Sequence, residues 1–234
     1  KQKTAYEMQR SLVRSEMCIR DRIYRAWYQR SKEKMMYIPV YYFLGSSVTR
    51  GSATDGVSFV EVLSERMGCC CIKNAVDGTT LADIEERSYP WRLRSLPPPE
   101  ETAHFFIQLS TNDVARGVPI GVVHKGMDRA NIDRSTALGG AEDIILFLRS
   151  HYRAPITFFT SWCDNVAYAK LVGGIYELRK KYSIGVLDFY RFQNMPAIAP
   201  SEFASYKADG THPNAKGYRL SLIHISEPTR LRCI

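Results

Sequence analysis

The chain has 234 residues, of which 45% are hydrophobic and 24% charged, as in an ordinary globular protein. This length is enough for one sizeable core and short for two ordinary domains. The sequence contains no long uncharged apolar run, which excludes a transmembrane helix and argues against a membrane partner. The composition also excludes a collagen-like, disordered or disulfide-dense chain.

The formal net charge of +8 is concentrated at the two ends of the chain. Residues 1–40 and 220–234 together carry +7, so residues 41–219 carry only +1. A basic chain ordinarily favours binding to nucleic acid or to an anionic surface. Because the body of this chain is nearly neutral, we expect no nucleic-acid partner. A nucleic-acid binder stays as an alternative that depends on the terminal charge alone.

Two terminal segments resemble the translation of one DNA element read in opposite directions. Residues 15–21 read SEMCIRD, which the string TCGGAGATGTGTATAAGAGACAG encodes, and residues 220–226 read LSLIHIS, which its reverse complement encodes. That element resembles the transposase adapter of sequencing libraries. We therefore expect residues 1–22 and 220–234 to be non-native, and residues 23–219 to form a single domain that is truncated at its C-terminus. Both ends are left out of the site arguments below.

Five short apolar runs, rich in β-branched and aromatic residues, predict five strands between these ends. In chain order the runs are 37–44, 69–76, 104–109, 155–160 and 184–189. Helical patterns alternate with them, one after the first run and one on each side of the fourth. The apolar faces of these helices are expected at Phe59, Val60, Leu63 and Met67, then at Ala141, Ile144, Ile145, Leu148 and Tyr152, and then at Tyr168, Leu171, Val172 and Ile175.

This alternation of strand and helix is typical of an α/β protein with a parallel sheet covered by helices on both faces. The nearly continuous apolar character of the runs agrees, because such strands are buried on both sides. In open sheets of this type, ligands bind outside the carboxyl ends of the strands. The candidate functional residues are therefore sought where the predicted strands end.

Polar and glycine-rich blocks stand at these strand ends. GSSVTRG at 45–51 follows the first strand, NAVDGT at 74–79 completes the second, STND at 110–113 follows the third, and DGTHP at 209–213 comes after the fifth. Each block falls where a parallel sheet places its binding site.

The chemistry of these blocks points to nucleophilic catalysis. A serine hydroxyl such as that of Ser47 is a weak nucleophile at neutral pH and needs a general base, a role that suits the imidazole of His212. Asp209 precedes His212 by three residues, so one turn can present both side chains, and the carboxylate can orient the imidazole. The backbone N–H groups of Ser47 and Gly78 and the side-chain amide of Asn112 are candidate donors to an oxyanion.

Together the four blocks resemble the SGNH hydrolase family, also called GDSL hydrolases, over about residues 37–219. In that family the first block reads Gly-Asp-Ser, an apolar residue, Thr and a later Gly. Gly45, Val48, Thr49 and Gly51 fit this pattern, which puts Ser47 at the nucleophile. Two residues depart from the family pattern. In the first block Ser46 stands where the family has Asp, and in the third block Ser110 stands where the family usually has Gly.

The resemblance implies a three-layer α/β/α sandwich, flavodoxin-like, with a central parallel sheet of about five strands. It implies a catalytic triad of Ser47, Asp209 and His212 and an oxyanion hole formed by Ser47, Gly78 and Asn112. It also implies hydrolysis of a carboxylic ester through an acyl-enzyme, with a small-molecule ester as the partner and without a metal or organic cofactor. A small-acyl or carbohydrate ester, as for a deacetylase, is the expected substrate, because no wide apolar substrate surface is evident.

Two further alternatives stay open. One is a lysophospholipase or thioesterase. The other is a non-catalytic ligand-binding module on the same fold, which the departures at Ser46 and Ser110 would favour.

The adjacent Cys69, Cys70 and Cys71 do not have the spacing of zinc ligands. Unpaired cysteines of this kind favour a reducing compartment, so we expect a cytoplasmic location. Nothing in the sequence indicates an oligomeric state.

Overall fold

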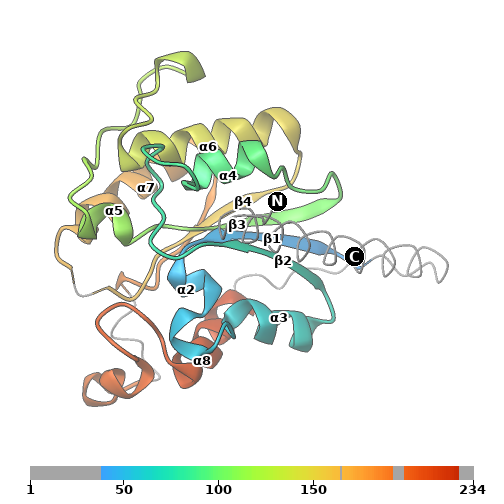
Figure 1. Ribbon diagram of the computed structural model, residues 1–234, viewed down its shortest axis with the longest axis vertical. Coiled ribbons are helices and arrows are strands. Elements are labelled where there is room, and N and C mark those ends of the chain that lie inside the picture. The colour runs from blue at the N-terminus through green and yellow to red at the C-terminus, as the bar shows by residue number, and fades with distance from the viewer. Residues whose placement is uncertain (1–37, 164, 192–197, 227–234) are drawn as a thin grey trace, which may run out of the picture. The chain divides into compact units, whose positions relative to one another are not determined.

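A computed structural model describes residues 38–163, 165–191 and 198–226, and those from Pro39 onwards belong to one compact unit. Its centre is a sheet of five parallel strands in the order β2-β1-β3-β4-β5 (Figure 1). The strands are β1 (Val40–Gly45), β2 (Cys70–Ala75), β3 (Thr102–Gln108), β4 (Ile156–Phe159) and β5 (Gly185–Leu187). All five predicted strands are therefore present, each with bounds shifted by a few residues.

Helices cover both faces of the sheet, which confirms the predicted three-layer, flavodoxin-like fold. In Figure 1, α4, α6 and α7 lie on one face, while α2, α3 and α8 lie on the other. The helices are α2 (Ser47–Arg50), α3 (Phe59–Met67), α4 (Tyr89–Ser95), α5 (Asn112–Ala115), α6 (Ala137–His151), α7 (Tyr168–Tyr182) and α8 (Ala215–Ser226). Short 3-10 turns add η1 (Ser52–Thr54), η2 (Arg129–Asn131) and η4 (Pro200–Tyr206).

Strand β1 lies between two hydrophobic cores, because its side chains alternate between the two faces. Tyr42 and Leu44 belong to the core under α4, α6 and α7, whereas Tyr41 and Phe43 belong to the core under α3 and α8. The Phe43 ring stacks on that of Phe106 in β3, with centroids 4.9 Å apart. All six residues of β1 are buried, so the strand is a rigid support for the loop that follows it.

The structure corrects one predicted core position. Met67 was expected on the buried face of α3, but 41% of it is exposed. Eight residues of α-helix turn about 80° past two full turns, so Met67 lies at the edge of the stripe that Phe59 begins. The next residue, Gly68, has a φ of 59° and ends the helix.

Helix α8 continues through part of the segment predicted to be non-native. The Asn214 side chain caps its start by accepting a hydrogen bond from the N–H of Gly217 at 3.0 Å. Leu220 packs against the core under α3 and α8, and Ser221 is buried. The other predicted non-native segment, residues 1–22, lies outside the described residues. No helix among the described residues is long and apolar enough to cross a membrane.

Candidate active site

The candidate nucleophile stands at the point where the strand order of the sheet reverses. β1 is paired with β2 on one side and with β3 on the other, and the chain passes from Gly45 at the end of β1 directly into α2. Ser47 is the first residue of α2, and Asn112 begins α5 after β3. The carboxyl ends of two such strands form the crevice in which open α/β sheets bind ligands.

Close contacts of Gly45 with α2 and with the end of β3 set the geometry of the nucleophile loop. A Cβ atom at Gly45 would lie 1.9 Å from Thr49 Oγ1 and 2.8 Å from Gln108 Oε1, so only glycine fits there. Gln108 Oε1 accepts hydrogen bonds from the N–H of Ser46 at 2.9 Å, the N–H of Thr49 at 3.2 Å and the hydroxyl of Thr49 at 2.7 Å. The buried end of β3 thus fixes the first turn of α2.

Ser47 and Ser46 occupy different environments. The Ser46 hydroxyl is fully buried and accepts a hydrogen bond from Gln108 Nε2 at 3.0 Å. Ser47 Oγ instead lies 2.8 Å from Nε2 of His212. The structure therefore brings Ser47, and not its neighbour, to the candidate base.

Asp209 and His212 form one compact turn. Asp209 Oδ2 lies 2.7 Å from Nδ1 of His212, while Asp209 Oδ1 accepts hydrogen bonds from the N–H of His212 at 2.7 Å and the N–H of Thr211 at 2.8 Å. Burial acts to raise the pKa of Asp209, but the two backbone N–H groups and the imidazole outweigh it and hold that pKa below its ordinary value. The carboxylate is thus anionic at neutral pH and can hold the proton of His212 on Nδ1.

Helix α8 ties this turn to the nucleophile loop. The turn closes with a hydrogen bond from the N–H of Ala208 to the carbonyl of His212 at 2.8 Å. Two residues after Pro213 the chain enters α8, where the hydroxyl of the buried Tyr218 donates to the carbonyl of Val48 at 2.8 Å. Val48 directly follows Ser47, so the same helix that follows His212 contacts the nucleophile loop.

The candidate oxyanion donors are held by neighbouring segments. The N–H of Ser47 lies in the first turn of α2, where a helix offers no internal acceptor. Gly78 has a φ of 74° in the turn after β2. The side-chain amide of Asn112 donates to the carbonyl of Thr79 at 2.9 Å, and in the part of the chain that the structure describes no acceptor takes its second hydrogen. Among the described residues, none accepts a hydrogen bond from the N–H of Gly78.

Sequence reasoning missed the residues that hold these donors in place. Ser110, noted only as a departure, is buried, donates to the carbonyl of Thr79 at 3.2 Å and accepts from the N–H of Asn112 at 3.1 Å. Asp113 is buried and accepts hydrogen bonds from the N–H groups of Leu81 and Ala82 at 2.9 and 3.0 Å. Burial raises its pKa in spite of these bonds. Gln108, which fixes the nucleophile loop, was missed as well, although a polar residue in the apolar strand HFFIQL was a signal for it.

The described ranges contain no group of three or more His, Cys, Asp and Glu side chains that could hold a metal ion. Cys69, Cys70 and Cys71 are free thiols. The chemistry that the arrangement itself offers is that of a serine hydroxyl beside an imidazole and a carboxylate, next to backbone and amide N–H donors.

Comparison with solved structures places the chain among known folds. A protein from Lactobacillus plantarum has a TM-score of 0.68 at 17% identity, over 85% of this chain and 100% of its own. A member of the lipolytic protein G-D-S-L family from Veillonella parvula has a TM-score of 0.60 at 16% identity, over 84% of this chain and 100% of its own. A carbohydrate esterase, whose active site displays divergent catalytic and non-catalytic binding functions, has a TM-score of 0.57 at 14% identity, over 86% of this chain and 71% of its own.

At these identities the likeness concerns the fold, and the chain has the fold of these GDSL-type lipolytic and esterase structures. The resemblance noted in the sequence is thereby confirmed at the level of fold. No protein-family model and no curated protein matches the chain.

Proposed function

We propose that this chain is a serine hydrolase of the SGNH type that cleaves carboxylic esters through an acyl-enzyme. The observation that carries the proposal is the hydrogen-bonded series Ser47–His212–Asp209, with 2.8 Å between the first two side chains and 2.7 Å between the last two. Ser47 and the turn that holds Asp209 and His212 lie far apart in the chain, with 165 positions between Ser47 and His212. The GDSL-type structures with the same fold support this assignment.

In the proposed reaction Ser47 Oγ attacks the ester carbonyl while Nε2 of His212 takes its proton. Asp209 keeps the other imidazole proton on Nδ1 and stabilises the imidazolium that forms. The negative charge on the tetrahedral intermediate is taken up by N–H groups of Ser47, Gly78 and Asn112. His212 then protonates the leaving alcohol, and a water molecule activated by the same imidazole hydrolyses the acyl-serine.

We propose a short acyl group, such as acetyl, as the preferred substrate group. A carbohydrate esterase among the structures with this fold supports a deacetylase-like activity.

Labelling with a fluorophosphonate probe, followed by peptide mass mapping, tests the proposal, because such probes react with activated serines. We expect one label on Ser47, its loss in Ser47→Ala, and strong slowing in His212→Ala. Ser46→Ala is the matched control and should keep the label. A label on Ser46, or none on folded wild-type protein, would contradict the assignment.

Turnover of p-nitrophenyl acetate against its long-chain homologues then tests the acyl preference. We expect faster turnover of the acetyl ester. Faster turnover of long-chain esters would favour the lysophospholipase or thioesterase alternative. Saccharide binding by a folded protein that neither labels nor hydrolyses esters would favour the non-catalytic module.

A further inference from the structure

Arg92, in α4, is a buried cation that the proposed chemistry does not use. Only 2% of its surface is exposed. A guanidinium carries five N–H donors, and here each of them has an oxygen acceptor. The acceptors are the carbonyls of Arg87 at 2.9 Å, Asn74 at 2.7 Å and Gly45 at 2.8 Å, the Oδ1 atom of Asn74 at 2.7 Å, and the Oγ1 atom of Thr79 at 3.3 Å.

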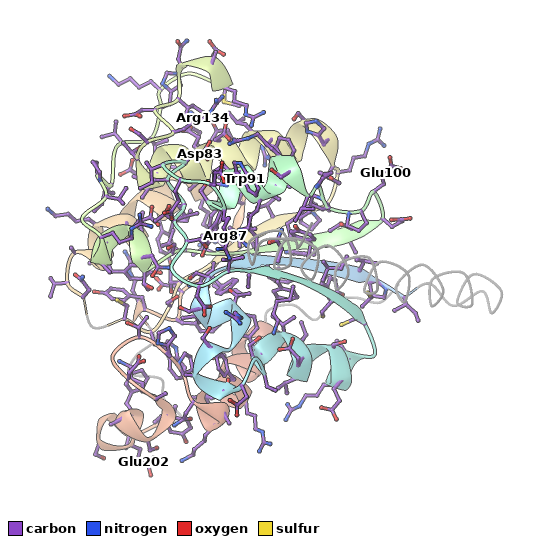
Figure 2. The ribbon with its side chains drawn as sticks, viewed as in Figure 1. Asp83, Arg87, Trp91, Glu100, Arg134 and Glu202 are labelled. Atoms are coloured by element: carbon purple, nitrogen blue, oxygen red, sulfur yellow. The ribbon has the colours of Figure 1, made fainter. Side chains whose placement is uncertain are left out.

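This arrangement is costly for the fold. A buried cation is ordinarily paired with a carboxylate, yet within the described parts of the chain Arg92 forms no ion pair. Burial lowers the pKa of the guanidinium. Arg87, labelled in Figure 2, has a φ of 78°, a conformation that favours glycine, and its carbonyl accepts from Nε of Arg92. Strain of this kind gathers where a precise local geometry matters.

The acceptors connect Arg92 to each candidate oxyanion donor through one or two intervening residues. Gly45 ends β1 two residues before Ser47, and Thr79 directly follows Gly78. The carbonyl of Thr79 in turn accepts the hydrogen bond from the amide of Asn112. One planar side chain therefore spans the end of β1, the end of β2 and the turn that holds two of the three donors.

We propose that Arg92 is a positioning residue that sets the distances between Ser47 and the oxyanion donors Gly78 and Asn112. The inference rests on the proposed function. Lysine at this position keeps the charge, but its single ammonium group cannot reach acceptors on four segments at once. The resulting shift of the donors slows attack by Ser47 more than it weakens substrate binding, because the oxyanion forms only in the transition state.

The test compares Arg92→Lys with Arg94→Lys, the same change two residues further along α4. Arg94 is 38% exposed and pairs with Asp83, labelled in Figure 2, at 2.5 Å and with Asp143 at 3.6 Å. Thr79→Val is the second test variant. It keeps the side-chain shape and removes one acceptor of Arg92, together with the hydrogen bond from Thr79 Oγ1 to the carbonyl of Val76 at 2.7 Å. For each protein we measure thermal unfolding, the rate of fluorophosphonate labelling, and kcat and KM for p-nitrophenyl acetate as a function of pH.

Folded Arg92→Lys should label and turn over about 10-fold to 100-fold more slowly, since a misplacement of about 1 Å costs on the order of 10² in rate. KM should change less than about threefold, and the acidic limb of the pH profile should stay in place, because Asp209 and His212 are untouched. Arg94→Lys should stay within about twofold of wild type. Thr79→Val should be slower by a smaller factor, and combining it with Arg92→Lys should be less than additive.

A folded Arg92→Lys protein that labels at the wild-type rate would overturn the inference. A loss of rate matched by a rise in KM, or by a displaced acidic limb, would also overturn it, because that is the pattern of a generally disturbed site. If Arg92→Lys does not fold, Thr79→Val decides in the same way. Wild-type protein without any label would instead contradict the proposed function, and this inference with it.

Discussion

Replacing Asp209 by asparagine should be more damaging than removing its side chain. The backbone N–H groups of Thr211 and His212 lie 2.8 and 2.7 Å from Oδ1, so the asparagine oxygen must face them. Its NH2 group then faces Nδ1 of His212, which forces the ring proton onto Nε2, the atom that should accept from Ser47. A wrong tautomer of this kind lowers kcat by about 10⁴, which equals about 5.5 kcal/mol of transition-state stabilisation.

Alanine at the same position leaves a gap that water can fill, because 55% of the Asp209 side chain is exposed. Water can accept the proton of Nδ1, so we expect a fall in kcat of about 10² for Asp209→Ala. The measurement is kcat for p-nitrophenyl acetate in both variants at neutral pH, with thermal unfolding as the check on folding. An asparagine variant as active as the alanine variant, or more active, would refute this account of the turn.

Gly45→Ala should lower the free energy of unfolding by more than about 2 kcal/mol, because the new Cβ would overlap Thr49 Oγ1; urea denaturation measures this. Gln108→Met should lower it by about 3 kcal/mol, since the buried N–H of Ser46 and the hydroxyl of Thr49 lose their acceptor; the same denaturation checks it, and an unchanged midpoint would contradict it. The depressed pKa of Asp209 adds stability that is present above its unfolded value of about 3.9 and is lost as the pH falls through the folded value. Below about pH 4, the melting temperature should therefore fall less steeply with decreasing pH in Asp209→Ala than in wild type.

The strands could be predicted because each one is a short apolar run, and the first three runs end at a glycine or a polar block. The five candidate site residues could be proposed for the same reason, since each stands directly after a strand or in the Asp209–His212 turn. The distances between them could not be predicted. They depend on Gln108 and Thr79, whose partners lie 59 and 33 residues away in sequence.

Helix α4 was not predicted, because its seven residues, YPWRLRS, include a proline and two arginines and show no apolar stripe. Arg92 looks like a surface residue in that pattern. Its burial depends on the carbonyls that strands β1 and β2 present at their ends, which is a property of tertiary structure. The prediction for Met67 was wrong for the opposite reason, since the apolar character of its side chain suggested a core position that the helix geometry does not provide.

The two halves of the candidate site differ in when they can form during folding. The Asp209–His212 turn is local, with hydrogen bonds that span two to four residues, whereas the contact between His212 and Ser47 joins residues 165 positions apart. Closing a loop of that length costs more chain entropy than any contact within the turn. Recovery of serine reactivity during refolding should therefore trail the return of secondary structure, which makes the reactive serine a reporter for the last long-range closure of the chain.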